Sequence, residues 1–397
     1  MPVRRGRWWR WSVVSAGVAV LVALPFAIAA WPVQAAAVTT AQLADRIAAS
    51  AATPYQGFVL SSGIAGLPNL PQVSDVIALL NGETNLRAYY ASPKKWRVDQ
   101  IGPGTERDLY QTASGQVLWD FGANRVTSIV GELPVRLPRG SDLVPPDLAR
   151  RLLAVARESV PPPVITRLPD RRVAGHAAAG IRIAPADKAA TVDHIDIWAD
   201  PETGLGEHVA ITGRGASAPI LETRFLDLSF GTPDEATLTP PNPTGDVEGS
   251  VTTAGDVNSA LNSLRPGPLP STLAGKPRTV GTPVQGTPGT FVLGGTGISF
   301  VPVIGDTGVG AYGSGFTEFL VLSVNRGTGQ DASDRAIKAG GLPVTLNGGQ
   351  GVLLSTSLFS VMVVSSPQAR RTYLLVGLVD SSLLKQAGEE LAAFRGR

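Results

Sequence analysis

Residues 192–230 read VDHIDIWADPETGLGEHVAITGRGASAPILETRFLDLSF, and this stretch predicts three consecutive antiparallel strands. Ile195 and Ile197 share one face of the first strand, while His194 and Asp196 share the other. The segments DPETG and GRG carry turn chemistry, because proline fixes one torsion and glycine accepts positive ones. A meander of this kind leaves one apolar face that another element must cover.

Composition places the chain among globular proteins without disulfides. Of 397 residues, 43% are apolar and 17% are charged, which suits two or three hydrophobic cores. The 45 glycines and 32 prolines favour short strands and loops over long helices. There is no cysteine, so we expect neither a disulfide nor a lipid-modified cysteine.

The first 36 residues predict a targeting segment, with two alternatives that stay open. Four arginines precede an uncharged run at 11–37, and the small-residue pattern at 33–35 is typical of signal peptide cleavage. Trp11 and Trp31 bracket 19 residues (12–30), a length that suits a retained transmembrane anchor. Either alternative places the rest of the chain outside the cytoplasm, secreted into the cell envelope or anchored to the membrane.

Charge argues against nucleic acid as a partner. The chain has 34 basic and 32 acidic residues, and four of the basic ones lie in the targeting segment, which has no acidic residue. The exported part therefore has 30 basic and 32 acidic residues, a net charge of −2. No basic surface is left to attract a polyanion.

Hydrophobic periodicity predicts an α+β fold that is mostly antiparallel β. We expect about ten strands and two helices before residue 241, the second helix at 148–159, arranged as a strongly curved, incomplete β-barrel closed by helices. A smaller C-terminal α+β domain follows, with strands near 290–293, 316–324, 351–355, 359–365 and 373–379 and a helix at 381–394. The expected domains are a targeting segment (1–36), a half-barrel (37–241), a Pro/Gly-rich linker (242–286) and the C-terminal domain (287–397).

Polar motifs give no support for catalysis, a metal or a cofactor. His176, His194 and His208 lack metal-ligand spacing, and strand alternation predicts that Asp193 faces away from His194 and Asp196. The segment GVGAYG at 308–313 matches a dinucleotide fingerprint in letters. A strand rather than a helix is expected after it, so it predicts a glycine-rich turn.

Apolar residues are the candidate binding residues. Three tryptophans remain after export and lie on predicted strands, where they fill either an ordinary core or the wall of a cavity. The apolar stripe of the second helix and the covered face of the 192–230 meander complete the set. The cavity candidates are Trp96, Trp119, Leu148, Leu152, Val155, Ile195, Ile197 and Trp198.

Several short motifs resemble the outer-membrane lipoprotein carrier family (LolA type) over residues 40–240. They are Tyr55-Gln56-Gly57, Trp96-Arg97-Val98, Trp119-Asp120, Val173-Ala174-Gly175, Ile197-Trp198-Ala199-Asp200, Thr203-Gly204-Leu205, the spaced Thr223, Phe225 and Asp227, and the exit Phe230, Ala236 and Pro240. Residues 311–316 (AYGSGF), 371–379 and the final helix resemble sigma-E regulatory proteins (RseB type). Ser314 replaces an aspartate of that family's segment.

The resemblance implies a hydrophobic cavity for lipid and no catalysis. The leading functional hypothesis is an exported, non-enzymatic binding protein that holds a lipid, lipopeptide or lipoprotein acyl chain, as carrier or envelope sensor. The alternative is a regulator of an extracytoplasmic-function sigma factor pathway, whose C-terminal domain binds a membrane-anchored anti-sigma factor. The resemblance assigns no ligand-contacting residue to a position of this chain.

Overall fold

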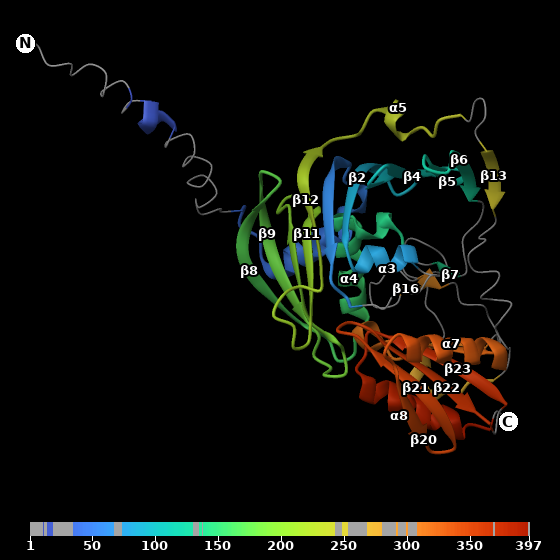
Figure 1. The fold of residues 1–397 in the computed structure, drawn as a ribbon. Helices are drawn as coiled ribbons and strands as arrows, with labels where there is room; N and C mark the ends of the chain where they lie inside the picture. The colour runs from blue at the N-terminus through green and yellow to red at the C-terminus, as the bar shows by residue number, and fades with distance from the viewer. Residues whose placement is uncertain are drawn as a thin grey trace, which may run out of the picture.

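The computed structural model describes residues 11, 14–18, 35–66, 74–129, 135–136, 138–242, 248–252, 268–279, 291–292, 299–300, 308–367 and 370–395 (Figure 1). Most of the targeting segment lies outside these residues. So do residues 257–264, for which the sequence predicts a short helix within the linker. Within them, no helix combines the length and the apolar character needed to cross a membrane.

A twelve-stranded sheet dominates the molecule. Its strands are, in spatial order, β13 (Glu248–Thr252), β6 (Arg125–Ile129), β5 (Gly115–Asp120), β4 (Thr105–Thr112), β3 (Lys95–Gly102), β2 (Glu83–Ser92), β1 (Tyr55–Gly63), β12 (Leu221–Phe230), β11 (Gly206–Gly213), β10 (Val192–Ala199), β9 (His176–Ala184) and β8 (Val164–Val173). All neighbours pair antiparallel except β13 and β6. Among the described residues the edge strands β8 and β13 do not pair with each other, so the sheet stays open.

Helices occupy the inner side of this sheet, which arches over them in Figure 1. They are α2 (Thr40–Ala49), α3 (Ser74–Leu80) and α4 (Pro145–Glu158). The sequence predicts that this first helix starts with Thr39 or Thr40 as its cap. Thr39 is the cap, and it forms a capping box with Gln42. Two prolines open α4, where their missing N–H groups cost nothing, and its apolar stripe is buried as predicted.

An eight-stranded sheet forms the second half of the molecule. Its spatial order is β14 (Thr272–Leu273), β15 (Lys276–Thr279), β18 (Val309–Tyr312), β19 (Phe319–Val324), β23 (Arg371–Gly377), β22 (Ser360–Ser366), β21 (Gly349–Ser355) and β20 (Leu342–Leu346). Helix α8 (Ser381–Ala393) packs with Met362 and Leu375 on one face. Ala336 of helix α7 (Arg326–Lys338) packs with Val352 and Val363 in a separate cluster.

Two parts of the C-terminal half differ from the sequence prediction. Helix α7 was not expected, because its sequence RGTGQDASDRAIK carries two glycines and almost no apolar stripe; only Gly329 and Ala336 are buried. The segment 308–313 is largely strand β18 rather than a turn, and strand β19 follows it after the short 3-10 turn Gly315–Thr317. The helix that a dinucleotide fingerprint requires is therefore replaced by a strand.

The segment expected as a linker contributes strands to both sheets. β13 lies at the edge of the larger sheet, and β14 and β15 lie at the edge of the smaller one. A small third sheet joins β7 (Val135–Arg136), β17 (Ser299–Phe300) and β16 (Phe291–Val292), the last within the predicted strand at 290–293. The division into four domains remains a prediction.

The two large sheets meet over a short, well-bonded contact. The Thr191 N–H donates to the Leu378 carbonyl (3.0 Å), and the Asp380 N–H donates to the Ala189 carbonyl (2.8 Å). Lys276 pairs with Asp187 at 2.7 Å, and the Phe316 N–H donates to Ser159 Oγ at 3.3 Å. The two sheets therefore share one continuous apolar core at this contact, to which Phe316, Leu358, Phe359 and Leu378 contribute.

Candidate functional site

A small apolar cavity lies where the larger sheet, its helices and the C-terminal half come together. Only about 30 Å³ of it can hold the centre of a water-sized sphere. All but one of its lining residues are apolar: Leu79, Leu80, Pro138, Asp142, Leu143, Leu148, Leu152, Val192, Ile211, Leu221, Leu358, Phe359 and Leu378. A water needs about 10–15 Å³ of such space, so the cavity has room for about two waters.

Helix α4 supplies the floor of this cavity because its apolar stripe faces the sheet. Leu148 and Leu152 are one turn apart and are 3% and 1% exposed. The one polar lining residue, Asp142, is held by Arg151, whose Nη1 lies 2.6 Å from Asp142 Oδ1. The carboxylate is thus neutralised locally, and the rest of the cavity wall is hydrocarbon.

The far wall comes from the hairpin turn between β21 and β22. Leu358 and Phe359 are buried on this turn, and Thr356 accepts and donates hydrogen bonds within it. The hydroxyl of Thr191 donates to the Leu358 carbonyl at 2.6 Å, which ties the turn to β10. The C-terminal half therefore closes the cavity of the larger sheet.

The structure brings together five of the eight residues proposed for the cavity. Leu148 and Leu152 line it, and Val155, Ile195 and Ile197 are buried in the same core without lining it. Trp96 is partly buried against this core. The other two tryptophans lie elsewhere.

Trp198 lies on the outer face of the larger sheet, opposite the core. It stacks on His208 with ring centroids 4.8 Å apart, and the Arg171 guanidinium lies 3.9 Å from its ring centroid. Burial lowers the pKa of His208 to about 4, although Glu222 beside it acts in the opposite direction. Trp198 and Ile197 are adjacent on β10, so their side chains point to opposite faces of the sheet. Because Ile197 faces the core, Trp198 faces away from it, and its prediction as a cavity residue was wrong.

Trp119 also faces away from the cavity. It stacks on Phe121 at 5.1 Å and pairs across strands with Asp108. We call the cavity and its lining residues the apolar junction. Neither Trp119 nor Trp198 lines it.

The histidine and two aspartates of β10 are closer than alternation predicts. A β-bulge between Val192 and His194 brings the Asp193 carboxylate to 2.8 Å from His194 Nδ1. Asp196 lies 3.9 Å from His194 Nε2 but is held by Arg182 through two bonds of 2.7 Å. The predicted separation of Asp193 from His194 was therefore wrong, because a bulge adds a residue that strand periodicity does not count.

Two features of the inner side of the larger sheet have no counterpart in the sequence prediction. The wall formed by Leu358 and Phe359 comes from a hairpin far away in the chain, which no local pattern reveals. Glu207 is completely buried on the inner face of β11, and neither carboxylate oxygen has a hydrogen-bond partner among the described residues. Burial raises the pKa of Glu207 to about 8, with a smaller contribution from Asp200. The sequence did contain a signal for this buried carboxylate, because Glu207 alternates with Val209 and Ile211 and so falls on the same apolar face of the strand.

Comparisons with known proteins return similar structures but no family. No protein-family model matches the chain, and no curated protein matches it. MucB in complex with MucA(peri) is 14% identical, with a TM-score of 0.46 over 88% of this chain and 97% of that chain. The MucA/MucB complex of Pseudomonas aeruginosa is 15% identical, with a TM-score of 0.46 over 88% of this chain and 96% of that chain.

A LolA superfamily protein from Nitrosomonas europaea is 11% identical, with a TM-score of 0.22 over 51% of this chain and 99% of that chain. The LolA-type resemblance suggested by the sequence motifs thus recurs among the similar solved structures. Similarity at these values assigns no function to this chain.

Proposed function

We propose that this protein is an exported, non-enzymatic binding protein that takes an acyl chain into the apolar junction between its two sheets. The observation that supports this most is the lining of the cavity, where twelve of the thirteen residues are apolar and the remaining carboxylate is paired with Arg151. A hydrocarbon chain needs no hydrogen bond from its surroundings, so such a wall suits it better than a polar ligand.

Binding requires the cavity to widen. Pockets that hold drug-sized ligands span roughly 300–1,000 Å³, far more than the space present here. We expect the turn carrying Leu358 and Phe359 to be the wall that moves, with the bond from the Thr191 hydroxyl to the Leu358 carbonyl breaking as it does so. An acyl chain that enters beside Leu152 therefore pushes this turn outward and changes how the C-terminal half is held, which suits an envelope sensor as well as a carrier.

Native mass spectrometry of the delipidated full-length protein with added palmitate tests this function. The variant Leu152→Phe fills the available space with an aromatic ring and should lower palmitate binding at least about tenfold, since each lost methylene contact is worth ~0.8 kcal/mol. The matched control Leu226→Phe makes the same change at a half-exposed position of β12 and should bind as the parent does. Equal binding by all three proteins, or none by the parent, would sink the proposal.

A second candidate function is the regulation of an extracytoplasmic-function sigma factor pathway through a protein partner. The supporting observation is strand β20, which ends the eight-stranded sheet and exposes the side chain of Leu342 by 70%. An unpaired strand edge with an exposed apolar residue can accept a strand from a partner.

The test of the second candidate needs the full chain. Residues 287–397 alone lack β14 and β15 of their sheet and would expose Leu358 and Phe359. A pull-down of membrane-protein partners should therefore compare the full-length protein with the variant Leu342→Lys, which places a charge on the edge. Recovery of the same partner by both proteins excludes β20 as the binding edge.

A further inference from the structure

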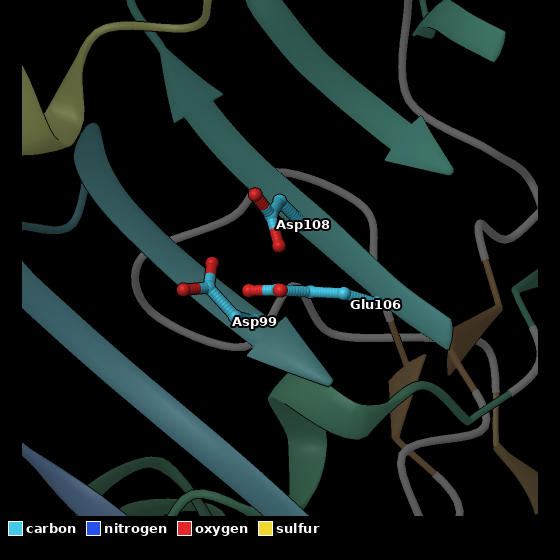
Figure 2. A group of neighbouring side chains, drawn as sticks. All are labelled: Asp99, Glu106 and Asp108. Carbon is cyan, nitrogen blue, oxygen red and sulfur yellow. The ribbon is translucent and has the colours of Figure 1, made fainter. Parts of the chain in front are cut away.

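Three carboxylates converge on the outer face of the larger sheet, away from the apolar junction. Asp99 of β3 and Asp108 of β4 are direct cross-strand partners, and Glu106 lies two residues before Asp108 on the same face. One oxygen from each of the three lies within 4.8 Å of the others. Figure 2 shows the three side chains turned toward one another from two adjacent strands.

Two of these carboxylates are buried and only half satisfied. The side chains of Asp99 and Asp108 are each 1% exposed. Arg97 donates to Asp99 Oδ1 at 2.5 Å and to Asp108 Oδ2 at 2.8 Å. The second oxygens, Asp99 Oδ2 and Asp108 Oδ1, receive no hydrogen bond from an N–H or O–H donor of the described residues. Burial, with the carboxylate of Asp99 opposite, raises the pKa of Asp108 to about 7. Buried polar atoms are rarely left so, because each lost partner costs about 1–3 kcal/mol.

The local charge is also unbalanced. Like charges directly opposite each other on neighbouring strands are destabilising. Arg97 supplies one positive charge to three carboxylates, and its guanidinium lies 5.6 Å and 5.0 Å from the ring centroids of Tyr89 and Tyr110. Arg87, the cross-strand partner of Asp99 on β2, has an exposed side chain that makes no ion pair with the cluster within the part of the chain that is described. A further cation would offset the remaining negative charge.

We propose that Asp99 Oδ2, Asp108 Oδ1 and the carboxylate of Glu106 bind one calcium ion. Calcium is a hard cation that takes oxygen ligands at 2.3–2.6 Å, so two ligands on opposite sides of the ion can be about 4.8 Å apart. Magnesium needs shorter bonds and near-ideal octahedral geometry, which rigid strand positions supply less easily. The site has no nitrogen or sulfur ligand that would favour zinc or copper. This inference is independent of the acyl-binding proposal.

Isothermal titration calorimetry with calcium chloride tests the site on the full-length protein after treatment with EDTA. A site with three protein carboxylates beside one arginine should bind with a Kd on the order of 10⁻⁴–10⁻³ M, and magnesium chloride should bind more weakly. Glu106→Gln removes one ligand charge from a half-buried position that Arg97 does not touch. It should weaken calcium binding by at least about tenfold and leave the circular dichroism spectrum unchanged.

The control is Glu202→Gln, which removes the same charge from the exposed turn between β10 and β11. It should bind calcium as the parent does. Three results would overturn the proposal: no calcium heat at millimolar concentrations, undiminished binding by Glu106→Gln, or an equal loss in Glu202→Gln. Magnesium binding as tight as calcium binding would overturn the choice of ion.

Discussion

The two faces of the twelve-stranded sheet are stabilised by different chemistry. The inner face packs against α2, α4 and the β21–β22 turn, and its contacts are almost entirely hydrocarbon. The outer face carries ionic and aromatic groups, with Arg97 between two buried aspartates at one end and the exposed Arg171 over the buried Trp198 at the other. A single period-two pattern thus directs apolar residues to one side and a charged, stacked layer to the other.

This difference between the two faces predicts which substitutions lower the free energy of unfolding, and by what mechanism. On the outer face, removing one member of a charge cluster leaves its partners buried and unpaired. On the inner face, removing carbon leaves a void.

Arg97→Met should be the most damaging change. It leaves Asp99 and Asp108 opposite each other without a cation, and breaking a buried pair by removing one partner costs about 3–5 kcal/mol. Urea unfolding in EDTA measures this loss. The control Arg125→Met removes an ion pair with Glu248 whose side chains are 48% and 64% exposed, and it should cost less than about 1 kcal/mol. Equal costs for the two variants would remove the distinction between the faces.

Leu152→Ala should lower the free energy of unfolding by about 2–5 kcal/mol. The side chain is 1% exposed and lines an existing cavity, so its loss adds a void that the surrounding structure fills only partly. Denaturant unfolding gives the value, and Leu226→Ala, at a residue 47% exposed, should change stability by less than about 0.5 kcal/mol. A cost for Leu152→Ala below about 1 kcal/mol would show that the inner core is loosely packed.

Glu207 is a buried carboxyl on the otherwise apolar inner face. Its contribution is tested by the pH dependence of the free energy of unfolding. Burial raises its pKa from 4.5 to about 8, so the folded protein holds a proton that the unfolded chain has released. Its contribution to stability is therefore complete at pH values below 4.5 and is lost as the pH rises to about 8. This loss is on the order of a few kcal/mol.

The variant Glu207→Gln should unfold with less pH dependence across that range, measured as urea midpoints at several pH values. Glu202→Gln, on the exposed turn, should keep the slope of the parent. A parental slope in Glu207→Gln would mean that this carboxyl does not titrate abnormally.

Arg171→Met should have the smallest effect of the four. It removes a cation–π contact of 3.9 Å with Trp198 and a 3.0 Å bond to His208 Nδ1, together worth about 0.5–2 kcal/mol. The neighbouring Arg172→Met removes an equally long side chain from an exposed site and should change the thermal midpoint much less. Equal shifts in the two thermal midpoints would show that the stacking of Arg171, Trp198 and His208 does not contribute to stability.

The sequence predicted most of the larger sheet because its strands are local patterns. Strand alternation, turn residues and the Thr39 cap each act over a few residues, and strands β10, β11 and β12 follow the meander predicted at 192–230. The cavity was harder to predict from the sequence than the sheet. Leu152 was found from the stripe of its own helix, whereas Leu358 and Phe359 join it from more than 200 residues away.

Other misses have equally physical causes. The bulge near His194 shifts the register by one residue, which a strict period of two cannot represent. Helix α7 is too polar and too rich in glycine to show a stripe. Asp99 and Asp108 meet only through strand pairing, so no spacing within the chain brings their carboxylates together.

The most direct test of the acyl-binding account is a crystal structure of the delipidated protein soaked with bromopalmitate. The account predicts anomalous bromine density between Leu152 and Phe359, with the β21–β22 turn displaced from its bond to Thr191. Bromine bound only on the surface, with that bond intact and the cavity unchanged, would contradict it.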